Sequence, residues 1–178
     1  SYAGVLERHG QGPLGSWPAQ DLVGLPVPMT LARVSGLAGT PQEKYATLLE
    51  ASAIAMLRFD MAVDLHVDKP VSHNVRWLDF THMLTFGNAV RQLCDVDPGL
   101  WPQALLQMGC FLGRNAPFLL PAMDESWFVP DAEAFITEAR ATLYDHGIRE
   151  PIYACHRVKM IEAVDEEILA APASRLKA

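Results

Sequence analysis

From Thr40 onward, apolar residues recur every three or four positions along most of the chain. This spacing is typical of amphipathic α-helices. Proline and glycine interrupt it often enough to separate five helical stretches. We therefore predict an all-α fold of about five helices, packed as a bundle over residues 41–178.

The first of these helices opens with the clearest local signal. Thr40-Pro41-Gln42-Glu43 is a capping box with proline at the first helical position. Gly87 falls inside the second helix, where glycine is tolerable if another part of the molecule or a ligand approaches closely. Residues 117–130 are rich in proline and aromatics and are predicted to form a loop with buried anchors. The expected helices cover residues 41–65, 75–94, 97–113, 131–146 and 151–170.

Residues 1–40 have a different composition from the rest of the chain. They hold seven of the twelve glycines and four prolines, and no helical or strand period is visible in them. We predict an irregular arm that lies over the helical core. Because the sequence starts at Ser1 rather than at methionine, we also expect the chain to be the C-terminal part of a longer protein.

Composition excludes several classes of protein. Hydrophobic residues make up 50% of the chain and charged residues 20%, which is unlike a disordered protein. The net charge of −7 leaves no basic stripe for nucleic acid. No apolar run approaches the roughly 20 residues that span a bilayer. The three cysteines show no CxxC spacing and lie in apolar stretches, so we expect buried thiols and a reducing cytoplasm.

Two histidines fall on or near apolar faces of predicted helices. His156 shares a helix with Lys159 one turn later, and an i, i+3 pair of nitrogen donors is able to serve one metal ion. A desolvated lysine loses its proton more easily, and its amine can then take up CO₂ as a carbamate ligand. The alternative is structural: His156 donates to a backbone carbonyl while Lys159 pairs with Glu162.

His82 is the second candidate, with Asp79 one turn earlier on the same helix. A carboxylate in that position can orient a metal-bound imidazole. It also fits a half-buried His–Asp pair with no metal. His66 and His73 flank Pro70 at a spacing that matches no compact metal motif.

Three segments resemble proteins of the questin oxidase-like family. They are THMLTFGNAVRQL, LLQMGCF and HRVKMIEAVDEEI, and the resemblance covers about residues 73–170. The first contains a histidine followed by a threonine and an Ala-Val-Arg run, and the last reads His-x-Val-Lys before an alanine and acidic residues. Related helical domains follow Rieske-type iron–sulfur domains in some longer proteins.

The resemblance implies an all-α oxygenase that binds non-haem iron through histidines and a carbamylated lysine and oxidises polycyclic aromatic compounds. Carried over by position, the ligands are His82, His156 and Lys159. The family also has earlier histidines, for which His73 and His66 are the remaining candidates. A [2Fe-2S] cluster on a neighbouring domain is a further implied cofactor.

These observations leave three hypotheses. The first is a metal-dependent oxygenase for an apolar or aromatic small molecule, with a pocket lined by aromatic residues. The second is a non-catalytic helical module that packs against an iron–sulfur or other redox domain, and the third is a metal-free binding bundle. Self-association is a further possible partnership. The aromatic candidates are Trp77, Phe80, Phe86 and Trp127, and of these Trp77 and Phe86 are the predicted substrate contacts, although aromatics at helical spacing more often belong to an ordinary core.

Overall fold

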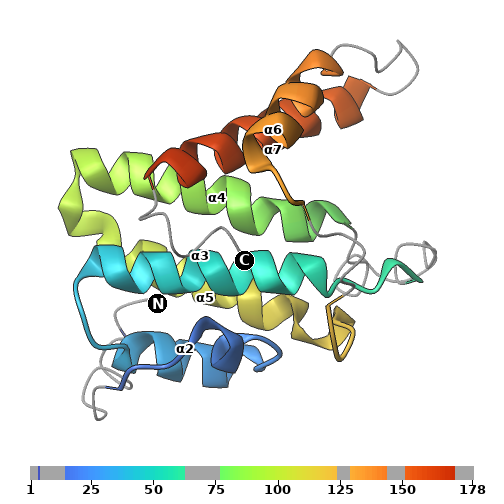
Figure 1. Ribbon diagram of the computed structural model, residues 1–178. Coiled ribbons are helices and arrows are strands. Elements are labelled where there is room, and N and C mark those ends of the chain that lie inside the picture. The colour runs from blue at the N-terminus through green and yellow to red at the C-terminus, as the bar shows by residue number, and fades with distance from the viewer. Residues whose placement is uncertain (1–3, 5–14, 63–76, 124–128, 144–150, 171–178) are drawn as a thin grey trace. The chain divides into compact units, whose positions relative to one another are not determined.

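Helices dominate the structure, and this confirms the all-α prediction. The computed structural model describes residues 4, 15–62, 77–123, 129–143 and 151–170 (Figure 1). The chain divides into two compact units, residues 1–124 and 125–178. The α-helices of the described residues are α2 (Val27–Gly36), α3 (Pro41–Leu57), α4 (Trp77–Val96), α5 (Trp101–Asn115), α6 (Ala132–Ala141) and α7 (Pro151–Ala170).

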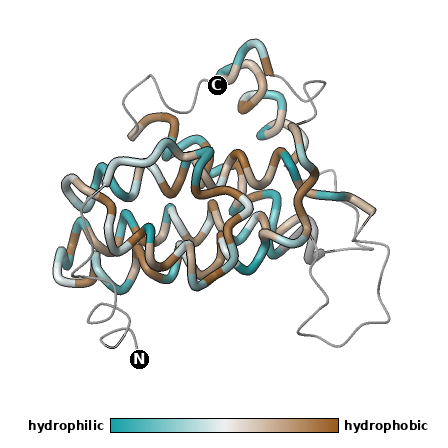
Figure 2. Tube along the Cα trace, turned by 90° about the horizontal axis from the view of Figure 1, so that it is seen from below, coloured by the Kyte–Doolittle hydropathy of each residue, from teal (hydrophilic) through white to brown (hydrophobic). Residues whose placement is uncertain are grey.

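The first unit is built around three helices that pack on one another, α3, α4 and α5, while α2 packs against α5 (Figure 1). Apolar and polar residues are interspersed along these helices (Figure 2), as expected when one side of each faces a core. Burial of this apolar surface is the main force that holds the unit together. The large apolar side chains with almost no exposure include Leu22, Leu48, Phe80, Met83, Leu106 and Leu112.

Helix starts follow the capping signals in the sequence. The Thr40 hydroxyl accepts a hydrogen bond from the Glu43 backbone N–H at 3.2 Å, and the Glu43 carboxylate accepts one from the Thr40 N–H at 2.8 Å. This reciprocal pair is the predicted capping box. At α6, the Asp131 carboxylate accepts from the Ala134 N–H at 2.9 Å. Such caps supply acceptors for backbone N–H groups of the first helical turn, which have no acceptor within the helix.

The expectation of an irregular arm over residues 1–40 is wrong for two described segments. Residues Ala19–Leu22 form a short 3-10 helix, η1, and α2 follows it. Pro26 is the N-cap of α2, and Pro28 lies in its first turn, where a missing N–H costs nothing because that donor has no intrahelical partner. The prolines therefore start this helix instead of preventing it.

Two predicted helices end earlier than expected, while α7 covers the predicted range. α3 ends at Leu57 rather than near Leu65, because the next residues pair with a distant segment: the Asp60 N–H donates to the Phe118 carbonyl at 2.9 Å. α6 ends at Ala141 rather than at His146. The short 3-10 helices η4 (Pro98–Leu100) and η5 (Ala116–Phe118) flank α5.

Glycines allow close helix packing in the first unit. Gly87 is buried in α4, and a Cβ there would lie 3.3 Å from the ends of the Leu49 and Met108 side chains. At Gly113 in α5, a Cβ would lie 2.6 Å from the Val27 Cα and 2.8 Å from the Val27 N. The backbone of α2 thus approaches α5 at Gly113 more closely than any side chain would permit.

In the part of the second unit that the structure describes, α6 and α7 pack on each other. Among its described residues, the buried apolar side chains are Ile136, Leu143, Ile161 and Ala163. Among the described residues, no helix has the length and apolar character needed to cross a membrane.

Candidate functional site

His82 lies half-buried near the middle of the N-terminal half of α4. Asp79, one turn earlier, has its carboxylate 3.2 Å from the Arg114 guanidinium on α5. The Asn115 side chain, which is fully buried, donates from Nδ2 to the Asp79 backbone carbonyl at 3.4 Å. These contacts hold the start of α4 against the end of α5. His82 lies one helical turn after Asp79, and the ion pair with Arg114 fixes the position of the Asp79 carboxylate.

Aromatic residues of α4 are packed against other rings of the first unit. Phe80 is 2% exposed, and its ring centroid lies 4.2 Å from that of Phe59. Phe86 is half-buried, and its centroid lies 5.4 Å from that of Phe111. These tilted ring pairs are common core contacts. Both contacts are compatible with the core interpretation, and the role of Phe86 as a substrate contact stays a prediction.

The other two predicted ligands lie on α7, in the second unit. His156 is half-buried, whereas Lys159 is exposed. A carbamate requires a desolvated amine, and the ligand role of Lys159 stays a prediction. Glu162, the alternative partner of Lys159, forms an ion pair with Arg140 at 3.0 Å.

The complete predicted ligand set is not assembled by any one unit. His82 belongs to the first unit, and His156 and Lys159 belong to the second. His66, His73, Trp127 and the side chain of Trp77 lie outside the described residues. Within the ranges that are described, no three His, Cys, Asp or Glu side chains form a group able to hold a metal ion. The iron site therefore stays a prediction.

A charged network that the sequence analysis missed joins α6 to α7. The Arg140 guanidinium lies 3.0 Å from the Glu162 carboxylate and 2.6 Å from that of Asp165. The hydrogen bond to Glu162 is the main cause of the raised pKa of Arg140, so this side chain stays charged. Nearby, Arg157 donates to the Thr142 hydroxyl at 2.6 Å. The sequence does show that Glu162 and Asp165 lie one turn apart on α7. It does not show that Arg140 is their partner, because that depends on how α6 and α7 pack.

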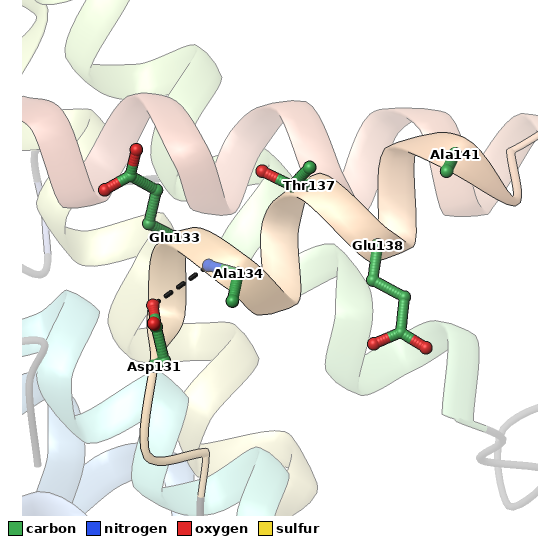
Figure 3. Close-up of a pocket in the computed structure, with 6 residues that line it drawn as sticks. All are labelled: Asp131, Glu133, Ala134, Thr137, Glu138 and Ala141. Carbon is green, nitrogen blue, oxygen red and sulfur yellow. Dashed lines mark hydrogen bonds between the residues drawn. The ribbon is translucent and has the colours of Figure 1, made fainter.

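A shallow hollow lies over the outer face of α6 (Figure 3). All six side chains that line it are exposed, and three of them carry carboxylates. Asp131 uses one oxygen to cap the helix, as the dashed line in Figure 3 shows. The lining contains no histidine, cysteine or cationic side chain. Its residues are Asp131, Glu133, Ala134, Thr137, Glu138 and Ala141.

Comparison with known proteins does not decide between the hypotheses. No protein-family model matches the chain. No curated protein and no solved structure matches it either. The resemblance to questin oxidase-like proteins therefore stays a prediction. The case for each candidate residue rests on its chemistry and its surroundings in the structure.

The three cysteines differ in exposure, and the expectation that all are buried is wrong for Cys155. Cys94 is 1% exposed, Cys110 is half-buried and Cys155 is exposed. Burial is the main cause of the raised pKa of the Cys94 thiol, and the neighbouring carboxylates of Asp95 and Asp97 add to it. Burial also raises the pKa of Cys110. A raised pKa keeps a thiol protonated, and a protonated thiol is a poor nucleophile and metal ligand.

Thiol labelling tests these differences in exposure among the three cysteines. In the folded protein we expect Ellman's reagent to react rapidly with Cys155 alone, and with all three cysteines after unfolding in guanidinium chloride. Cys155→Ser should remove the rapid phase and leave the slow reaction unchanged. A rapid phase that persists in this variant would show that Cys94 or Cys110 is accessible.

Proposed function

We propose that the chain is a helical interaction module that packs against a redox domain. The observation that carries this proposal is a set of exposed apolar side chains at one end of the first unit, which we call the apolar end. Its members, with their exposed fractions, are Leu57 (41%), Met61 (56%), Leu120 (39%) and Met123 (48%).

Backbone pairing brings the two halves of the apolar end together. The Leu120 N–H donates to the Arg58 carbonyl at 2.6 Å, and the Arg58 side chain donates from Nε to the Leu120 carbonyl at 2.7 Å. Phe59 and Leu119 form an antiparallel bridge between these contacts. The segments that carry the exposed side chains are therefore fixed next to each other, at the end where α3 and η5 meet (Figure 1).

Fixed, exposed apolar side chains are typical of an interface. Scattered single apolar residues are normal on a protein surface, but a gathered group marks a binding surface. Because the backbone beneath this group is already ordered, little conformational entropy is lost when a partner binds. The partner that we propose is the one that the sequence resemblance implies, a domain with a [2Fe-2S] cluster.

A binding experiment tests the apolar end directly. We expect a purified Rieske-type [2Fe-2S] domain to bind the chain in calorimetry, and Met61→Lys with Met123→Lys to weaken binding at least about tenfold, or roughly 1.4 kcal/mol. The matched control replaces two exposed residues of α4, Leu93→Lys with Val96→Lys, and should bind as the wild type does. Absence of binding, or equal weakening by both double variants, would refute the proposal.

The second candidate function is the metal-dependent oxygenase, and the surroundings of His82 favour it. The imidazole is half-buried, and Asp79 is held by Arg114 one turn away. Metal-bound imidazoles commonly have an oriented carboxylate nearby. In this proposal His82 supplies an imidazole ligand to non-haem iron, which would activate O₂ for oxidation of an apolar or aromatic small molecule.

Iron loading distinguishes the two candidates. For an interaction module, we expect protein incubated with Fe(II) under anaerobic conditions to retain far less than one iron per chain after desalting. His82→Ala, His156→Ala and Lys159→Ala should then leave the iron content unchanged. Retention of about one iron per chain that is lost in both histidine variants, but kept in His146→Ala, would favour the oxygenase.

A further inference from the structure

We draw no further inference here: the strongest candidate, the shallow hollow over the outer face of α6 (Figure 3), is an exposed acidic face with small residues between its carboxylates, and nothing in the described residues shows what would cover it.

Discussion

Phe80→Ala is expected to lower the free energy of unfolding of the first unit by about 3–5 kcal/mol. The Phe80 ring is 2% exposed and packs on Phe59, so alanine leaves a cavity that the surrounding helices fill only in part. Urea unfolding followed by circular dichroism measures the change. The control Leu93→Ala lies on the same helix with the side chain 56% exposed, and we expect a loss within about 0.5 kcal/mol.

The same experiment on Phe86 separates a core residue from a substrate contact. Since Phe86 is half-buried against Phe111, we expect Phe86→Ala to destabilise the unit by less than Phe80→Ala but clearly more than Leu93→Ala. A pocket residue would show little change in stability, because its ring would not be packed in the absence of substrate. Unchanged stability of Phe86→Ala would therefore favour the pocket interpretation of this residue.

Local signals were sufficient to predict several helices. α4 and α7 lie close to their predicted ranges, and the capping box at Thr40 was correctly placed. These elements depend on periodicity and on contacts within one helical turn. Such information is contained in a short stretch of sequence.

The failures have a different physical cause, which is long-range packing. α2 was missed because the glycine and proline content of residues 1–40, with no visible period, indicated an irregular arm, although a helix tolerates proline in its first turn and α2 packs against α5. The end of α3 was misplaced because the residues after Leu57 pair with a segment near Leu119. No local pattern contains either contact.

The candidate site, unlike the fold, stays a prediction, because it depends on packing that no helical pattern contains. Helical spacing placed His156 and Lys159 on one helix, but it could not show that Lys159 is exposed. It gave no means of distinguishing core rings such as Phe80 from pocket rings. The predicted ligands also belong to two units, so their convergence depends on packing between units and not on the pattern of either helix.

Gly113→Ala tests the closest helix contact of the first unit. The added methyl would lie 2.6 Å from the Val27 Cα and 3.0 Å from the Thr30 hydroxyl oxygen, so the backbone of α2 must move. Overpacking of this kind costs up to about 3 kcal/mol. Alanine recovers about 1 kcal/mol of helix propensity relative to glycine. We therefore expect a net loss of about 2 kcal/mol in urea unfolding.

Gly87→Ala is the matched control, because Gly87 is also a buried helical glycine. Its added methyl would meet the ends of the Leu49 and Met108 side chains at 3.3 Å, and the flexible Met108 can shift by a few tenths of an ångström. The gain in helix propensity then offsets the crowding, and we expect a change within about 1 kcal/mol. If Gly113→Ala were tolerated as well as Gly87→Ala, the close approach of α2 to α5 would be wrong. The packing of α2 on α5, which contradicts the predicted irregular arm, would then be wrong as well.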